Sequence, residues 1–160
     1  MQFFNRTLLI IYKNEFKKPG ELVIAQCIAE IITRFKSRYM KIKTANTILY
    51  CSKWEETVRF YREHLNLPVI FSTDWFVEFS LGTTSRLSIA DEKCASIKTC
   101  NGKGITLSLE VKNIDNARDF AEKSGLKPTM IKKHPWDART FYLFDPEGHR
   151  IEIWQSLNKG

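Results

Sequence analysis

The sequence predicts an α+β fold made of two modules that share one plan: a strand, a helix and then three strands. Three observations point to this fold. The plan occurs twice beyond residue 40, residues 105–111 alternate strictly between apolar and polar side chains, and a stretch containing Ser, Thr, Asn and two Gly (residues 93–104) separates the two copies. With 160 residues and 18.7 kDa, the chain has the size of one domain rather than two independent ones.

The first module is predicted to span about residues 41–92. Its opening strand, residues 41–50, is rich in β-branched side chains. Ser52 and Glu55 have the spacing of a capping box and open an amphipathic helix. The apolar face of this helix carries Trp54, Val58, Tyr61 and Leu65, ahead of a stop at Asn66. Three short strands are then expected at residues 68–72, 76–81 and 86–90.

The second module is predicted to span about residues 103–155. Its first strand, residues 105–111, alternates in polarity, so we expect one buried face and one polar face. Asn113 can cap the following helix, and Gly125 suits its end. The remaining strands are expected at residues 129–133, 140–144 and 150–154, with Asp145-Pro146-Glu147-Gly148 as the turn between the last two.

Residues 1–39 precede this repeated part and are expected to form an N-terminal extension to a domain at residues 40–160. Residues 7–12 suit a short strand, and residues 21–38 suit a helix with a broad apolar stripe. Such a helix can pack on the domain or on a partner, and a role in protein interaction is compatible with any function of the domain. A helix on a membrane surface is less favoured because its basic residues cluster at one end. A start site upstream of Met40 that adds this segment is another possibility.

Composition excludes several classes of protein. The chain is 43% hydrophobic and 27% charged, which rules out a disordered chain. Its net charge of +7 comes without any dense run of Lys and Arg, so no nucleic-acid partner is expected. The four cysteines lack the Cys-x-x-Cys spacing of zinc or redox sites, and Cys51 is expected in the core. With no signal peptide or membrane-spanning segment recognised, a cytoplasmic location without membrane contact is expected.

Three motifs accompany the repeated plan: Phe60-Tyr61-x-x-x-Leu65-x-Leu67, His134-Pro135-Trp136 and Phe141-x-x-x-Asp145-Pro146-x-Gly148-x-x-x-Glu152. Together they resemble the vicinal oxygen chelate superfamily, which includes glyoxalase I, extradiol dioxygenases, fosfomycin-modifying enzymes and bleomycin-resistance proteins. The resemblance covers about residues 41–155 and is closest to the bleomycin-resistance and glyoxalase-like branch. It implies two βαβββ modules whose curled mixed sheets surround one cavity, commonly within a homodimer.

Enzymes of this superfamily hold a divalent metal with His and Glu side chains from four inward-facing positions. The resemblance places these positions at Asn46, Ser88, Thr106 and Glu152. Only Glu152 is a credible ligand, since the other three are neutral and weak donors. Glu152 can equally pair with Arg or Lys across the sheet. We therefore expect no metal and no other cofactor.

The three histidines offer no clear alternative metal site. His64, late in the first helix, and His149, in a turn, are expected to be exposed, and their spacing matches no zinc motif. His134 lies where similar proteins border the cavity, so it can face a ligand or support the loop.

Aromatic side chains are expected to provide the binding surface. The resemblance places six of them around the cavity, although about half can instead be core residues. A cationic ligand would be balanced by Glu152 with Glu78 or Glu110, whereas Arg86 and Arg139 would suit an anion. The six aromatic candidates are Tyr50, Trp75, Phe76, Trp136, Phe141 and Trp154.

The favoured interpretation is a metal-independent protein that sequesters an aromatic or amphipathic, antibiotic-like compound between its two modules, as in antibiotic resistance. No catalytic residue is assigned, and no hydrolase or nucleotide-binding motif is recognised. A homodimer is expected. The alternative is a metal-dependent lyase, isomerase or dioxygenase of the same fold, which would use Glu152 with unconventional ligands such as His134.

Overall fold

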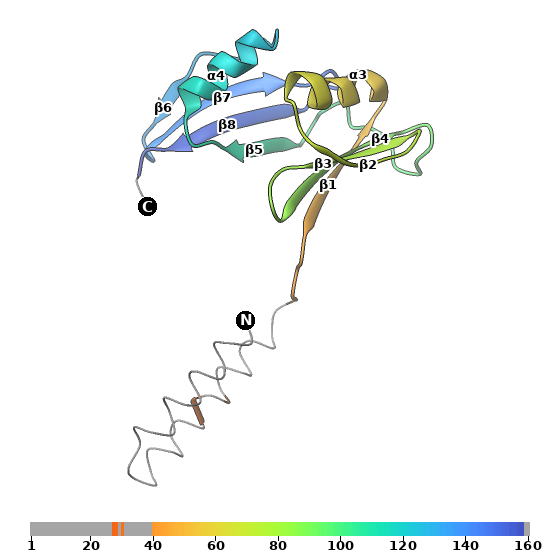
Figure 1. Cartoon of the computed structure of the whole chain (residues 1–160), viewed down its shortest axis with the longest axis horizontal. Coiled ribbons are helices and arrows are strands. Elements are labelled where there is room, and N and C mark those ends of the chain that lie inside the picture. Colours follow the sequence, from red (N-terminus) through yellow and green to blue (C-terminus); the bar gives the residue numbers. More distant parts are fainter. Residues whose placement is uncertain (1–26, 29, 31–39, 159–160) are drawn as a thin grey trace. The chain divides into compact units, whose positions relative to one another are not determined.

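The computed structural model describes residues 27–28, 30 and 40–158 (Figure 1). Lys43–Gly160 is a compact unit of its own. The strand predicted at residues 7–12 lies outside the described residues. Of the helix predicted at residues 21–38, only Cys27, Ile28 and Glu30 are described, and they are helical and exposed. Among the described residues, no helix has both the length and the apolar content needed to cross a bilayer.

Two modules with the predicted order of elements make up this unit, which confirms the fold class. The first module contains β1 (Ala45–Cys51), α3 (Trp54–Arg59), η1 (Phe60–His64), β2 (Val69–Ser72), β3 (Phe76–Ser80) and β4 (Ser85–Asp91). The second contains β5 (Thr106–Glu110), α4 (Ile114–Lys123), β6 (Lys132–His134), β7 (Ala138–Phe144) and β8 (Arg150–Ser156).

Each module forms a four-stranded mixed sheet with the same topology. The strand orders are β1-β4-β3-β2 and β5-β8-β7-β6. In both sheets the first and last strands of the module pair in parallel, and the other pairs are antiparallel. The two sheets are separate and do not close into a barrel (Figure 1).

One face of each sheet is buried under the helix of its own module. In the first module, this face carries Leu49, Val77, Phe79, Leu87 and Ile89, each at most 1% exposed. In the second, α4 covers β7 and β8, whose buried side chains include Phe141, Leu143 and Ile151. Because side chains alternate along a strand, the residues between these point to the opposite face, which no helix of the same module covers.

The first helix begins differently from the sequence prediction, but it ends ahead of Asn66 as predicted, since Leu65 is its C-cap and Asn66 has a φ of +51°. Ser52 is not its cap: the helix begins after Lys53 without a side-chain cap, because the Ser52 hydroxyl donates to Glu147 instead. From Phe60 the helix widens into the π-helical turn η1, in which the Leu65 amide donates to the Phe60 carbonyl at 3.1 Å. In the second module Asn113 caps α4 as predicted, accepting from the Asn116 amide at 3.0 Å.

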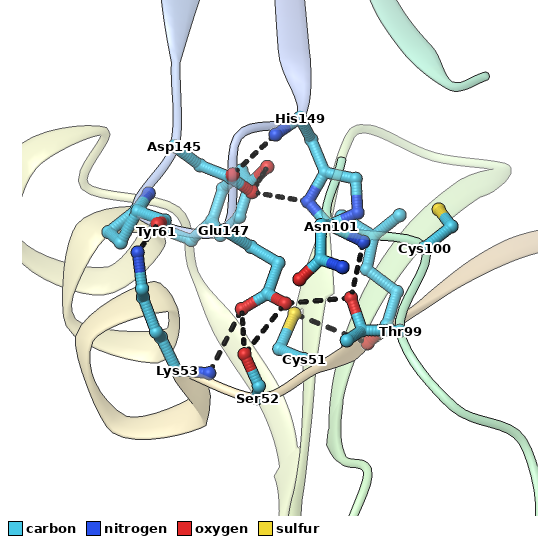
Figure 2. A network of polar contacts seen from close by, with 12 residues as sticks. Cys51, Ser52, Lys53, Tyr61, Thr99, Cys100, Asn101, Asp145, Glu147 and His149 are labelled. Atoms are coloured by element: carbon cyan, nitrogen blue, oxygen red, sulfur yellow. Dashed lines mark hydrogen bonds and ion pairs between the residues drawn. The ribbon is translucent and has the colours of Figure 1, made fainter. Parts of the chain in front are cut away.

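The buried carboxylate of Glu147, in the β7–β8 turn, joins the two modules (Figure 2). It accepts hydrogen bonds from the Ser52 hydroxyl at 3.0 Å, the Lys53 amide at 2.9 Å and the Thr99 hydroxyl at 2.7 Å. Burial raises the pKa of Glu147, but these hydrogen bonds outweigh it and the net pKa is below its usual range. The turn of the second module is therefore held by the first module and by the linker.

Asp145 begins the same turn and is buried with His149. It accepts from the Tyr61 hydroxyl at 3.0 Å and from the His149 amide at 2.8 Å, and the His149 Nδ1 lies 2.9 Å away. His149 is 1% exposed, so its predicted exposure was wrong. His64 is also half-buried rather than exposed, with its Nδ1 2.7 Å from the Ser124 carbonyl oxygen.

The linker passes so close to this turn that it requires glycine. A Cβ atom on Gly102, whose φ is +72°, would lie 2.1 Å from the carbonyl carbon of Gly148. Any side chain at this position would therefore force the two backbones apart.

Cys51 lies near the same turn. Burial and the charges of Glu147 and Asp145 raise the pKa of its thiol to about 12. This thiol is therefore an unreactive core group, as expected.

We predict that replacing Glu147 with Gln lowers the free energy of unfolding by about 1–3 kcal/mol at neutral pH, because an amide cannot accept the same three hydrogen bonds. The folded pKa of Glu147 lies below its ordinary 4.5, so the carboxylate stabilises the fold above that pH. This contribution is lost as the pH falls through the folded pKa. Urea unfolding at a series of pH values measures both effects.

The difference between wild type and Glu147→Gln should accordingly shrink below pH 4.5. The matched control is Glu122→Gln, which removes a carboxylate paired with Arg118 on the surface and should cost less than about 0.5 kcal/mol. Equal stabilities of wild type and Glu147→Gln at neutral pH would contradict the assigned role of Glu147.

Candidate functional site

The uncovered face of the first sheet carries a chain of polar contacts. The Ser88 hydroxyl donates to Asn46 Oδ1 at 3.0 Å, and Asn46 Nδ2 donates to Glu78 at 3.0 Å. Glu78 in turn forms an ion pair with Arg86 at 2.5 Å. The charge of Glu78 is thus balanced within the sheet, and Asn46 and Ser88 use their polar atoms on each other.

Aromatic and aliphatic side chains surround these polar groups. Tyr50 and Phe76 both pair in register with Ala90, which places them together on the uncovered face. The ring centroids of Trp75 and Phe76 are 5.7 Å apart, and those of Phe71 and Phe76 are 6.3 Å apart. Phe71, which the sequence analysis did not select, is 54% exposed.

The uncovered face of the second sheet is centred on Glu152. Its carboxylate accepts from the Ser108 hydroxyl at 2.6 Å and from the Tyr142 hydroxyl at 3.3 Å. Among the described residues, Glu152 makes no ion pair, so the alternative that it pairs with Arg or Lys across the sheet finds no support there. Its hydroxyl partners orient the carboxylate without neutralising its charge.

A pocket of about 250 Å³ lies beside this carboxylate. It combines two indole rings, two carboxylates and two hydroxyl groups, a mixture suited to orienting a small organic ligand. The lining contains three residues selected from the sequence, together with others that were not selected. The lining residues are Trp136, Asp137, Ala138, Thr140, Glu152, Trp154 and Ser156.

His134 supports one wall of this pocket. Its ring stacks on Trp136 with centroids 4.3 Å apart and planes at 20°, and its Nε2 lies 2.7 Å from the Thr140 hydroxyl. Both contacts hold neighbours that line the pocket. The geometry therefore favours the supporting role that the sequence analysis left open for His134.

Phe141 does not belong to the site that was predicted for it. Its ring is 1% exposed and lies on the helix-covered face, between Leu143 and the other core residues. The neighbouring positions Thr140 and Tyr142 face the pocket side instead, in register with Trp154 and Glu152. The strand register carries this assignment, because Phe141 pairs with Ile153, which is buried on the helix-covered face.

Arg139, which was considered as a partner for an anionic ligand, does not lie at the site. It forms a bidentate ion pair with Asp115 of α4, at 2.7 and 2.8 Å. This hydrogen bonding lowers the pKa of Asp115. Thr106, which was expected to face the ligand, instead accepts from Arg150 Nε at 3.0 Å.

A larger pocket of about 400 Å³ lies between α3 and the β2–β3 hairpin of the first module. Arg59, Arg62, Glu55 and Glu63 are among its lining residues, so its charges are mixed. None of the residues selected from the sequence lines it. We therefore place the candidate site at the smaller pocket, where the aromatic and acidic groups converge.

The donor set does not fit the divalent metal of the superfamily. Asn46 and Ser88 hydrogen-bond to each other, Thr106 accepts from Arg150, and only Glu152 of the four carries an acidic side chain. Across the described part of the chain, no group of three His, Cys, Asp or Glu side chains is placed to hold a metal ion. A single carboxylate among neutral oxygens binds transition metals weakly.

We predict that Asn46→Ala lowers the free energy of unfolding by about 1–3 kcal/mol, because it removes the partner of the fully buried Ser88 hydroxyl. Thermal or urea unfolding measures the loss. Asn116→Ala, on the exposed surface of α4, is the control and should change stability little. An unchanged stability in Asn46→Ala would show that the polar chain across the first sheet is not formed in solution.

Comparison with known proteins agrees with this architecture. A family model described as a glyoxalase-like domain matches residues 44–158. A glyoxalase/bleomycin resistance protein/dioxygenase from Nocardioides aligns with a TM-score of 0.65 and 19% identity, covering 83% of this chain and 95% of that one. No curated protein sequence matches the chain.

Two further solved structures have related folds but different described activities. Lactoylglutathione lyase from Agrobacterium tumefaciens aligns with a TM-score of 0.60 at 17% identity, over 73% of this chain and 96% of that one. The antibiotic binding protein TnmS3 from Streptomyces sp. CB03234 also has a TM-score of 0.60, at 18% identity, over 74% of this chain and 98% of that one. Since the glyoxalase-like family model spans both modules, the chain belongs to the glyoxalase-like family.

Proposed function

We propose that the protein binds a small aromatic or amphipathic molecule, without metal and without chemical turnover, at the uncovered faces of its sheets. The mechanism would be sequestration, as in resistance to an antibiotic-like compound, and we place it in the cytoplasm. The observation that carries this proposal is the pocket beside Glu152, in which indole rings and oriented polar groups converge, although three of the four family ligand positions offer only neutral oxygens.

Several features of the pocket support a binding role. Trp136 and Trp154 offer flat apolar surface that loses little side-chain entropy on binding. Thr140 and Ser156 add hydroxyl groups that can fix the orientation of a ligand. TnmS3, which shares the fold, is described as an antibiotic binding protein, so this architecture accommodates such a function in at least one relative.

The second candidate is a metal-dependent lyase, isomerase or dioxygenase. One observation favours it: Glu152 keeps a carboxylate at a family ligand position, and no described residue neutralises that carboxylate. Lactoylglutathione lyase shares the fold. This candidate requires ligands beyond the four family positions, because three of these offer only neutral oxygens.

Metal content separates the two candidates. The purified full chain is incubated with nickel, manganese, iron or zinc, dialysed and submitted to elemental analysis beside Glu152→Ala and Glu110→Ala. We expect far less than one metal per chain in all three proteins, because the donor set is weak. Near-stoichiometric metal that is lost in Glu152→Ala but kept in Glu110→Ala would overturn the proposal and support the lyase or dioxygenase.

Ligand binding is then tested by a thermal-shift screen of aromatic and antibiotic-like compounds. A compound at 100 times its dissociation constant stabilises the fold by about 2.7 kcal/mol, which raises the melting temperature measurably. The shift should be reduced in Trp154→Ala.

We also propose that the protein is a homodimer in which a second copy covers the exposed apolar side chains of both sheets. On the first sheet Ile48 is 40% and Phe71 54% exposed, and on the second Phe144 is 59% exposed. Exposed apolar patches of this kind favour association. Because each chain offers both sheets, one two-fold axis can set the first sheet of each copy against the second sheet of the other.

Sedimentation equilibrium of the full chain tests the dimer. We expect twice the mass of 18.7 kDa for the wild type and a shift toward monomer for Phe71→Glu, which places a charge on the uncovered face. Phe120→Glu is the matched control, since Phe120 is 45% exposed on α4, and it should stay dimeric. A monomeric wild type, or equal dissociation of both variants, would contradict this arrangement.

A further inference from the structure

We infer that the pocket beside Trp154 selects a planar organic cation, such as an aromatic amidinium or ammonium group. This inference rests on the proposed binding function and adds the charge and shape of the ligand. It starts from the lining of the pocket, which contains the carboxylates of Asp137 and Glu152 and no Lys or Arg. A site lined by one sign of charge and partly shielded from water attracts the opposite sign.

Glu152 keeps its charge available to a ligand. Ser108 and Tyr142 donate hydrogen bonds to its two oxygens, which fixes the carboxylate on the pocket side of β8. The ion pairs between described residues are made by other carboxylates, those of Glu78, Glu122, Asp115 and Asp145. Glu78 of the first sheet is the informative contrast, because Arg86 already neutralises it.

Two cationic side chains on this face of the sheet, Arg150 and Lys132, do not line the pocket. Arg150 donates to Thr106 and places its guanidinium 5.4 Å from the centroid of the Tyr142 ring. Lys132 pairs in register with Thr140, but its side chain is exposed and does not line the pocket. Neither base therefore occupies the position that a cationic ligand would take beside Glu152.

The indole rings add a preference for a flat cation. The faces of Trp136 and Trp154 carry the negative part of the ring quadrupole, which attracts a cation at short range. His134 stacks on Trp136 and holds that ring in place at the wall. A volume of about 250 Å³ accommodates one aromatic ring with its charged substituent rather than a whole drug-sized molecule.

Three probes of nearly equal shape test this inference: benzamidinium, neutral benzamide and the anion benzoate. Binding to the full-length wild-type protein is measured by calorimetry, with quenching of tryptophan fluorescence as a second readout. We expect benzamidinium to bind about 10-fold more tightly than benzamide, which corresponds to 1.4 kcal/mol, and benzoate to bind most weakly. The preference should fall as the salt concentration rises.

Two isosteric variants test whether the carboxylate of Glu152 causes the preference for the cation. Glu152→Gln should remove most of the preference for benzamidinium over benzamide, because it removes the charge that the cation would contact. Glu110→Gln is the matched control: Glu110 pairs in register with Trp154 but does not line the pocket, so the preference should persist. If a variant does not fold, the order in which the wild type binds the three probes still tests the preference for a cation.

The outcomes distinguish this inference from the proposed function. Equal or tighter binding of benzamide or benzoate, or no binding of any probe, would overturn the inference of a cation. The proposed function fails separately, by retention of metal at Glu152 or by the absence of any stabilising compound in the wider screen.

Discussion

The turn between β7 and β8 places two carboxylates in the interior, and both accept hydrogen bonds from outside their own module. Glu147 depends on the start of α3 and on the linker, and Asp145 depends on Tyr61 as well as His149. An unsatisfied buried carboxylate is costly, so the chain reaches low free energy only when both modules and the linker are in place. The relative positions of the two uncovered sheet faces follow from this one arrangement.

The two uncovered faces are chemically different although the modules share a plan. The first is electrically balanced, because Glu78 is paired with Arg86 and the amide of Asn46 links Glu78 to Ser88. The second leaves Glu152 charged beside two indole rings. If the proposed dimer brings one face of each kind together, the first face contributes apolar surface and neutral hydrogen-bonding groups, while the second supplies the charge that discriminates between ligands.

Local patterns were sufficient to predict most of the fold. Alternation in residues 105–111 and the Asn113 cap identify elements through interactions between near neighbours, which a sequence displays directly. Ser52 failed as a cap because its hydroxyl binds Glu147, 95 positions along the chain, and no local pattern reports a competitor at that distance. The buried position of His149 was missed for a similar reason, since distant segments, Tyr61 of the first module and the linker at Gly102, enclose the turn.

The candidate site was predictable only in part. Glu152, Trp136 and Trp154 line the pocket, and strand alternation with the family motif had placed them around the cavity. Phe141 was selected as an aromatic residue that the resemblance places around the cavity, but its pairing with Ile153 of β8 puts it in the core. Which carboxylate remains unpaired could not be read from the sequence, because that depends on which side chains meet across strands.

The close approach of Gly102 to the β7–β8 turn breaks the equivalence of the two modules. The corresponding turn of the first module, around Gly82, is exposed, and a Cβ atom there would meet nothing within 4 Å. Extra residues can be added to an exposed turn at little cost, whereas a turn enclosed by the linker has no room for them. Inserted residues, whether acquired in evolution or added as an engineered tag, should therefore be tolerated near Gly82 but not within residues 145–148.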